Sequence, residues 1–319
     1  MHYDVFNGDA DGICALHQLR LAFPRDAKCI TGVKRDINLL RQVEGRRGDT
    51  VTALDISMEK NHEALERLLA DGVAVDYFDH HFPGEIPDNP LLMAQIDTAS
   101  DMCTGLLVNN HLQDRFSPWA VVAAFGDNLF ESALATARSL NYDEEQLRQL
   151  EELGTLLNYN GYGSTTDDLF FHPEALYRKV QPYESPFDFI HEDVAFETLS
   201  KGYADDMRHA IGISPSFCND DCAVFILPNA AWARRVSGVY GNQLARDFPD
   251  RGHALLTELP DNAYQVSVRA PLNRKFGADD LCRQFPTGGG RKAAAGINHL
   301  PADQIDAFNA ALQAQFGRS

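Results

Sequence analysis

Residues 75–84 decide the fold of the N-terminal half of the chain and read Val75-Asp76-Tyr77-Phe78-Asp79-His80-His81-Phe82-Pro83-Gly84. The apolar start predicts a short buried strand, which ends in an acid and two adjacent histidines before a Pro-Gly stop. Ionisable side chains at the end of an apolar strand are costly unless their charge is compensated. A divalent metal ion would compensate it, because imidazole and carboxylate are ordinary ligands of such ions. On this stretch alone, a hydrogen-bonded Asp-His pair that caps the strand remains an equal alternative.

Strands and helices alternate on both sides of this stretch. The alternation predicts an α/β fold with an open, mostly parallel sheet that carries helices on both faces. The expected strands are residues 2–6, 28–32, 50–56, 72–79 and 92–97, and the expected helices between them are 13–23 and 59–70.

The rest of the chain is expected to form helices and then a second strand-rich region. Helical patterns cover 102–157 and 172–209, with an exposed connection at 159–168, and further strands at 223–227, 253–257 and 263–269 precede a helix at 302–316. This order predicts a smaller C-terminal α/β domain. We expect domains at residues 1–190 and 216–319, with a connection at 191–215.

The chain has 319 residues and a formal net charge of −18, which argues against a protein that coats long nucleic acid. Residues 267–319 carry seven basic and four acidic side chains and so are net basic. An acidic body with a small basic part suits a metal site and a pocket for a small anion, although solubility alone explains most of the acids. The six cysteines form no Cys-x-x-Cys pair, and no signal peptide or membrane span is evident, so we expect a cytoplasmic protein with reduced thiols.

Carboxylates follow other predicted strands as well. Asp9 and Asp11 follow the first strand, Asp55 ends the third, and Asp127 ends a helical run. Ligands of open parallel sheets bind beyond the carboxyl ends of the strands, so these acids and the histidines are expected to meet at a two-metal site for phosphoryl displacement. Taken singly, Asp9 and Asp11 could belong to a capped turn, and Asp55 could be an N-cap.

A glycine triplet, Gly288-Gly289-Gly290, precedes Arg291 and Lys292. The Ala-rich segment after them is expected to be helical, so that its backbone N–H groups and the two cations could bind an anion. A flexible turn without function is the alternative.

The sequence resembles the DHH family of phosphoesterases with a C-terminal DHH-associated domain, in particular its oligoribonuclease and linear-dinucleotide phosphodiesterase members. The matching motifs are Asn7-Gly8-Asp9-Ala10-Asp11-Gly12, Leu54-Asp55-Ile56-Ser57, Asp79-His80-His81, Gly126-Asp127, Val268-Arg269-Ala270 and Gly288-Gly289-Gly290-Arg291-Lys292-Ala293-Ala294-Ala295-Gly296. The resemblance covers both ends of the chain, while residues 130–220 carry little of it. It implies a catalytic DHH domain at 1–190 and a substrate-binding domain at 216–319.

The resemblance also implies two Mn²⁺ ions, with Mg²⁺ as the alternative, and a bridging hydroxide that attacks the phosphate. Asp9 would bind the first ion, Asp55 would bridge, and the second ion would take Asp11, His80 and Asp127. Of the catalytic residues His80, His81 and Asp55, His81 would touch the scissile phosphate or orient the nucleophile, and Asp79 would fix a histidine tautomer. The substrate-binding residues would be Arg269, Gly288, Gly289, Gly290, Arg291 and Lys292.

Three positions depart from the family pattern. Val5 stands where many relatives have a histidine, and Asn7 stands where others have an aspartate, so the first ion would be bound more weakly or through Asn7 or water. Arg291 replaces the histidine that usually follows the glycine triplet. A guanidinium there would grip a phosphate or stack on a guanine.

These features predict a metal-dependent hydrolase that cleaves short 5′-phosphorylated oligonucleotides, with linear dinucleotides such as pGpG first, to mononucleotides. The alternatives are a phosphatase of pAp-like nucleotides, an exonuclease of nano-RNA and, from another class, a non-catalytic nucleotide sensor. The expected partner is a short oligonucleotide or dinucleotide, with no membrane and no long nucleic acid, and a homodimer is left open.

Overall fold

The computed structural model describes residues 1–317, and the chain divides into two compact units, Met1–Gly202 and Tyr203–Ser319. The division falls within helix α9 (Val194–Ile211). Within residues 1–317, no helix is both long enough and apolar enough to cross a bilayer.

The first unit is built on a five-stranded sheet in the order β2-β1-β3-β4-β5, with all neighbouring strands parallel. Its strands are β1 (His2–Phe6), β2 (Lys28–Ile30), β3 (Thr50–Leu54), β4 (Ala74–Asp79) and β5 (Leu92–Ile96). The predicted α/β class and parallel sheet are therefore confirmed.

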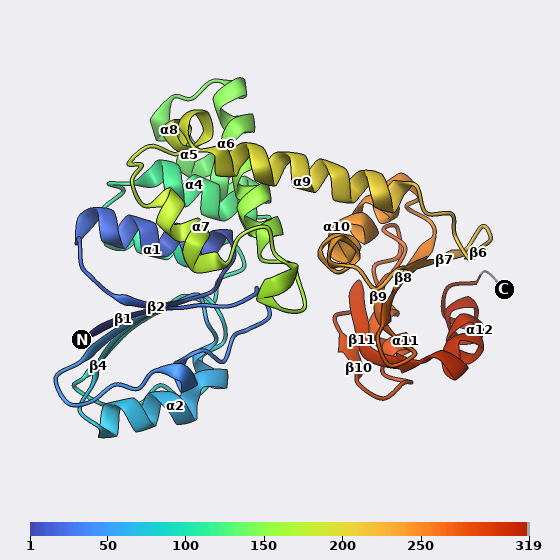
Figure 1. Cartoon of the computed structure of the whole chain (residues 1–319), viewed down its shortest axis with the longest axis horizontal. Coiled ribbons are helices and arrows are strands. Elements are labelled where there is room, and N and C mark those ends of the chain that lie inside the picture. The colour runs from blue at the N-terminus through green and yellow to red at the C-terminus, as the bar shows by residue number, and fades with distance from the viewer. Residues whose placement is uncertain (318–319) are drawn as a thin grey trace. The chain divides into compact units, whose positions relative to one another are not determined.

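Helices cover both faces of this sheet, and Figure 1 shows α1 (Ala10–Ala22) on one face and α2 (Met58–Ala70) on the other. The apolar side of α2 is buried through Leu65, Leu68 and Leu69. Strands buried on both faces carry near-continuous apolar runs, and Val5 and Ala53 pair in the centre of the sheet with no exposure.

The remaining helices of the first unit pack beyond α1. They are α3 (Thr104–His111), α4 (Ser117–Gly126), α5 (Phe130–Ala137), α6 (Glu144–Asn160), α7 (Pro173–Val180) and α8 (Pro186–Glu192). The expectation of an exposed connection over 159–168 is wrong at its start, because Tyr159 and Asn160 belong to α6 and are buried. The amide of Asn160 holds the backbone of Phe171, donating to its carbonyl at 2.9 Å and accepting from its N–H at 3.0 Å.

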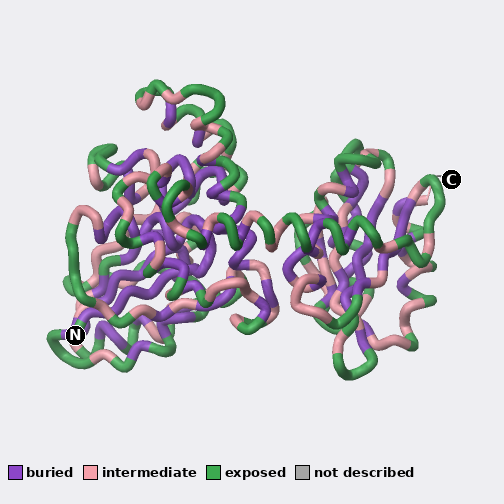
Figure 2. The backbone as a smooth tube through the Cα atoms, turned by 45° about the horizontal axis from the view of Figure 1, so that its top comes forward, coloured by how far each residue is buried: buried purple, intermediate pink, exposed green. Residues whose placement is uncertain are grey.

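The second unit has a six-stranded mixed sheet in the order β10-β11-β9-β8-β7-β6, of which only β7 and β8 pair in parallel. Its elements are β6 (Phe217–Cys218), β7 (Cys222–Leu227), α10 (Ala231–Asp247), β8 (Gly252–Leu259), β9 (Ala263–Arg269), α11 (Ala278–Cys282), β10 (Gly288–Gly290), β11 (Ala294–Pro301) and α12 (Ile305–Phe316). Each unit has a core of its own, and in Figure 2 the central strands of both are coloured as buried.

Candidate metal centre

The carboxyl edge of the parallel sheet gathers acidic side chains around one histidine. His80 follows β4 directly, and its Nε2 atom lies 3.4 Å from Asp55 Oδ1, 3.7 Å from Asp127 Oδ2 and 3.9 Å from Asp11 Oδ2. A divalent ion binds such atoms at about 2.0–2.2 Å, so two ligands of one ion are about 3–4 Å apart. Each oxygen is therefore at ligand spacing from His80 Nε2, and Asp11, His80 and Asp127 offer ligand atoms within 4.8 Å of one another.

The ring of His80 is oriented for this role. Its other nitrogen, Nδ1, lies 3.0 Å from the carbonyl oxygen of Met102, which can only accept a hydrogen bond. The proton is therefore on Nδ1, and the lone pair of Nε2 faces the carboxylates, as in histidines that ligate metals.

Asp11 is fixed by the start of another helix. Its carboxylate accepts hydrogen bonds from the backbone N–H groups of Thr104 at 2.8 Å and Gly105 at 2.7 Å, in the first turn of α3. A Cβ atom at Gly105 would lie 2.4 Å from the Cβ atom of Ala123 in α4, so only glycine allows α3 to pack this closely against α4. Sequence reasoning missed both residues, because the donors are backbone groups that no side-chain pattern reports.

Asp55 is not the N-cap of the helix that follows it. Ser57 caps α2 by accepting from the Lys60 N–H group, which removes the alternative considered for Asp55. Asp55 has φ 56°, a left-handed conformation that is unfavourable for most non-glycine residues. Strain of this kind persists where the surroundings require one side-chain direction, and here it turns the carboxylate towards His80.

Burial and mutual repulsion make the ionised forms of these carboxylates costly. Burial, together with the neighbouring carboxylates of Asp11 and Asp9, raises the pKa of Asp55 well above its ordinary value. Burial and Asp127 also raise the pKa of Asp11, although His80 partly offsets them. A divalent cation would relieve this repulsion, so the residues fit a bound divalent ion, and a mixed set of carboxylates and imidazole suits Mn²⁺.

Asp9 differs from the other acids because it already has a cationic partner. Its Oδ2 atom forms an ion pair with the ammonium group of Lys34, and its Oδ1 atom accepts from the Gly12 N–H group at 3.1 Å as the N-cap of α1. Burial alone would raise the pKa of Asp9, but Lys34 outweighs it and the pKa is lowered. Asp9 is thus the N-cap of α1, and its predicted role as a metal ligand stays a prediction; the sequence did not reveal Lys34.

The second histidine is held by the acid that precedes it. His81 Nδ1 lies 2.7 Å from Asp79 Oδ1, which also accepts from the His80 N–H group at 2.9 Å. The hydrogen bond to Asp79 raises the pKa of His81 against the opposing effect of burial. His81, His80 and Asp55 also offer ligand atoms within 4.8 Å of one another, so His81 lies beside the cluster with a fixed tautomer.

Asn7, which precedes the Asp9–Asp11 turn, is also buried. Its amide nitrogen donates to the carbonyl oxygen of Lys34 at 3.2 Å. Asn7 therefore positions the segment that carries Lys34.

In the second unit, Arg269 is engaged with the neighbouring helix. Its guanidinium donates to Asn242 Oδ1 at 2.6 Å and to the Gly238 carbonyl at 3.2 Å, both on α10, and to Ser267 Oγ at 3.1 Å. These contacts give Arg269 a structural role, and any role in binding a substrate remains a proposal.

The glycine triplet lies in a β-hairpin, so the expectation of a helix after it is wrong. Gly288–Gly290 form β10, and the Ala-rich segment forms β11, which pairs with it and with β9. A Cβ atom at Gly288 would lie 1.8 Å from the Cys282 carbonyl, which explains why glycine is needed there. Arg291 and Lys292 are exposed at the hairpin turn, so an anion at this place would meet side-chain cations without a helix N-terminus.

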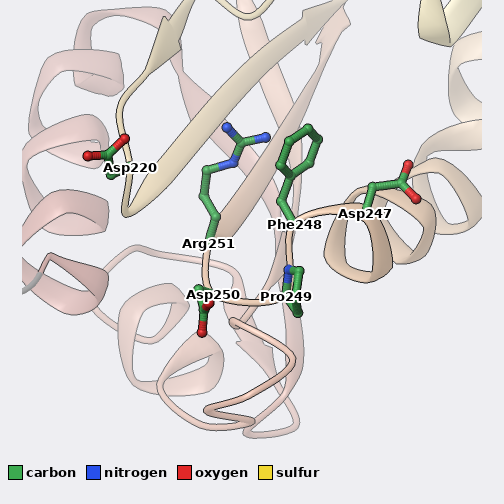
Figure 3. Close-up of a pocket in the computed structure, with 6 residues that line it drawn as sticks. All are labelled: Asp220, Asp247, Phe248, Pro249, Asp250 and Arg251. Carbon is green, nitrogen blue, oxygen red and sulfur yellow. The ribbon is translucent and has the colours of Figure 1, made fainter.

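A surface hollow of about 380 Å³ lies in the second unit, at the end of α10 (Figure 3). Three carboxylates in its lining make it a poor site for a phosphate. Its one cation, Arg251, lies over the Phe248 ring with 3.8 Å to the centroid and contacts Cys218 Sγ at 3.3 Å. The hollow is lined by Asp220, Asp247, Phe248, Pro249, Asp250 and Arg251, none of which was predicted as a site residue.

The sequence matches no protein-family model and no curated protein, so the comparisons rest on solved structures. An exonuclease RecJ bound to manganese is 17% identical with a TM-score of 0.63, over 98% of this chain and 89% of that chain. A pGpG-specific phosphodiesterase, PggH from Vibrio cholerae, is 13% identical with a TM-score of 0.59, over 99% and 98%. RecJ from Thermus thermophilus in complex with Mn²⁺ is 17% identical with a TM-score of 0.58, over 98% of this chain and 51% of that chain.

At these identities the comparisons establish the fold. The chain has the two-part fold of RecJ and PggH, so the predicted resemblance to DHH phosphoesterases is confirmed at the level of the fold. Fold alone does not fix an activity, which has to be argued from the residues of the site.

Proposed function

We propose that the protein is a divalent-metal-dependent phosphodiesterase that hydrolyses short 5′-phosphorylated oligonucleotides, with linear dinucleotides such as pGpG as the first candidates. The observation that carries the proposal is the set of three carboxylate oxygens 3.4–3.9 Å from His80 Nε2. When bound, the metal would activate water at neutral pH and neutralise charge on the phosphate. Mn²⁺ is the ion we propose first, with Mg²⁺ as the alternative.

Asp11, Asp55, His80 and Asp127 are the proposed ligands. Asp11 is held by two backbone N–H groups, and Asp55 accepts from the Thr104 hydroxyl at 3.3 Å, so the ligand oxygens are pre-positioned and little ordering is needed when the ion binds. Met102 keeps the His80 proton away from the cluster, which leaves Nε2 available as a ligand.

His81 is the proposed contact to the reacting phosphate. The hydrogen bond to Asp79 raises its pKa and so favours the imidazolium form. An imidazolium beside the cluster would stabilise the negative charge that develops on the phosphoryl oxygens in the transition state. Its side chain is 40% exposed, so a substrate can reach it.

The substrate class rests on charge and on the similar structures. An acidic chain with few clustered cations is unsuited to long nucleic acid, and the fold is shared with a pGpG-specific phosphodiesterase as well as with an exonuclease. Arg291 and Lys292 are the proposed contacts to the rest of the substrate, and a cytoplasmic location is proposed with it. A phosphatase of pAp-like nucleotides is the second candidate, because the ligand set would serve a monoester equally well.

Product analysis with a substrate panel tests the proposal. Protein loaded with Mn²⁺ is incubated with pGpG, pApA, pApG, a short RNA, pAp and a cyclic dinucleotide at equal concentration. Conversion of linear dinucleotides to mononucleotides, lost with EDTA and restored by Mn²⁺, is the expected result. Phosphate release from pAp with intact dinucleotides would favour the phosphatase, and metal binding without any turnover would favour the sensor.

A further inference from the structure

Lys34 has the surroundings of a bound cation. Its ammonium group pairs with Asp9 Oδ2, lies 2.9 Å from Asn158 Oδ1 and lies 3.4 Å from Asp127 Oδ1. An ammonium has three N–H donors and no acceptor, and here three oxygens from three separate parts of the chain surround it. Two of these oxygens belong to carboxylates, which compensate the positive charge of the ammonium group.

The backbone of Lys34 is held as firmly as its side chain. Its carbonyl accepts from the Asn7 side chain at 3.2 Å, and its N–H group donates to the Gly161 carbonyl at 2.9 Å. A Cβ atom at Gly161 would lie 3.2 Å from Asp9 Cβ and 3.3 Å from Lys34 Cβ, so glycine at this position keeps the three segments close. The position of Lys34 is thus built into the fold of the first unit.

Asp127 connects this ammonium group to the metal cluster. One of its oxygens, Oδ1, faces Lys34 Nζ at 3.4 Å, and the other, Oδ2, faces His80 Nε2 at 3.7 Å. Paired ions in two-metal sites lie about 3.5–4 Å apart, and Asp127 likewise places a positive charge on one side of its carboxylate and the candidate metal ligand His80 on the other. Lys34 Nζ is therefore a fixed positive charge beside the metal cluster.

We propose that the ammonium group of Lys34 takes the place of the second metal ion, so that the protein binds a single divalent ion beside His80. This proposal deepens the proposed function, because it specifies how many metal ions the site binds. It rests on that function only for the part that the ion and Lys34 play in hydrolysis. Asp9 is then a partner of Lys34 and not a metal ligand.

A single-ion centre changes how activity depends on metal. One ion gives a simple saturation curve for activation by Mn²⁺, without cooperativity. The fixed charge of Lys34 remains when the metal is removed, because it belongs to the chain. Lys34 is a charge-compensating residue, which holds Asp9 and Asp127 in place.

Metal stoichiometry tests the proposal independently of activity. The full-length protein, Lys34→Ala and Lys179→Ala are equilibrated with excess Mn²⁺ by dialysis. The bound metal is counted by mass spectrometry, and the Mn²⁺ electron paramagnetic resonance spectrum distinguishes isolated from spin-coupled ions. Lys179 is the matched control, because it also forms an ion pair in the first unit and its side chain is 34% exposed against 30% for Lys34.

We expect one isolated ion per chain in the wild type and in Lys179→Ala. Lys34→Ala frees the oxygens of Asp9, Asn158 and Asp127, and its stoichiometry is expected to double, with a spin-coupled signal. Two ions in the wild type would overturn the proposal, and so would one ion in a folded Lys34→Ala protein. If that variant does not fold, Lys34→Gln is the substitute, because it keeps a hydrogen-bond donor without the charge, and it is expected to bind two ions. The number of ions bound by the wild type tests the proposal even without a variant.

Hydrolysis measured on the same samples separates the two proposals. One bound ion with no turnover of any substrate would reject the proposed function and leave the assignment of Lys34 intact. Two bound ions with turnover would reject the assignment and leave the proposed function intact.

Discussion

The sheet edge of the first unit and the hairpin of the second unit hold their charges in opposite ways. In the first unit, Asp9, Asp11 and Asp55 are at most 2% exposed, and their carboxylates lie close together. In the second, Arg291 and Lys292 are exposed at a turn. Buried like charges are stable only with a compensating cation, whereas exposed charges interact weakly through water. Ligand-binding energy should therefore be concentrated in the first unit.

The largest effect is expected from His80→Gln. Loss of the imidazole ligand removes several kcal/mol of transition-state stabilisation, which corresponds to a fall in kcat/KM of about 10³-fold or more. His111→Gln is the control, because His111 packs against Phe78 of the same strand, 5.2 Å between ring centroids, outside the cluster. Steady-state rates on pGpG measure both, and an equal loss in the two variants would mean that His80 acts only in folding.

Mn²⁺ binding should stabilise the first unit selectively. At a free Mn²⁺ concentration of about 100 times the Kd, binding adds about 2.7 kcal/mol to the free energy of unfolding. Because the Thr104 and Gly105 N–H groups donate to the ligand Asp11, their hydrogen exchange should slow on addition of Mn²⁺. Amides of β11 in the second unit are the internal control, and equal slowing in both places would contradict a site confined to the first unit.

Acid should weaken the first unit through a histidine outside the cluster. Burial lowers the pKa of His17 from 6.5 to about 4, with an opposing contribution from its bond to the Tyr183 carbonyl. His17 has the higher pKa in the unfolded chain, which therefore takes up the proton first as the pH falls. The contribution of His17 to stability is complete above pH 6.5 and is lost as the pH falls towards 4. Between pH 7 and 5 the loss due to His17 is about 2 kcal/mol.

Urea unfolding at the two pH values measures this loss. Trp119 is a local reporter, because its ring lies 4.7 Å from that of His17, and Trp232→Phe removes the chain's other tryptophan. In His17→Gln the pH dependence should be weaker by the same amount. An unchanged pH dependence would assign the effect to other groups.

The smallest effect is expected in the hairpin. Replacing Arg291 and Lys292 together by alanine removes two exposed charges, and each contributes at most about 1 kcal/mol to the binding of an anion. We therefore expect KM to rise about tenfold while kcat is unchanged. Arg283→Ala is the control, because this exposed cation of the same unit pairs with Asp279 at 3.4 Å. A large fall in kcat would show that the second unit contributes to the chemical step itself.

The sequence predicted the acidic edge because a simple rule governs it. Parallel strands end at the same edge of a sheet, so Asp55, His80 and the acids after β1 had to meet once the strands were identified. Lys34 could not be predicted in this way, because its partner Asn158 is 124 residues away and neither residue belongs to a recognisable pattern. The backbone donors at Thr104 and Gly105 were hidden for a similar reason.

The Ala-rich segment after the glycine triplet was predicted wrongly because local preference was overridden by pairing. Alanine favours helices, but residues 294–301 pair with β9 on one side and with β10 on the other. At Gly296 a Cβ atom would lie 2.6 Å from the Val266 carbonyl, so the glycines serve close strand contacts. Such contacts depend on segments distant in the sequence.

The central claim is that the carboxylates around His80 form the metal site at which phosphodiester hydrolysis occurs. The most direct test is the rate of GMP formation from pGpG by metal-free protein as Mn²⁺ is added, in the wild type and in Asp55→Asn. Asparagine tolerates the left-handed conformation of position 55, so the fold is kept while one ligand charge is lost. We predict no rate without metal, saturable recovery in the wild type and at most about one thousandth of that rate in the variant. Hydrolysis that needs no metal, or equal recovery in both proteins, would contradict the claim.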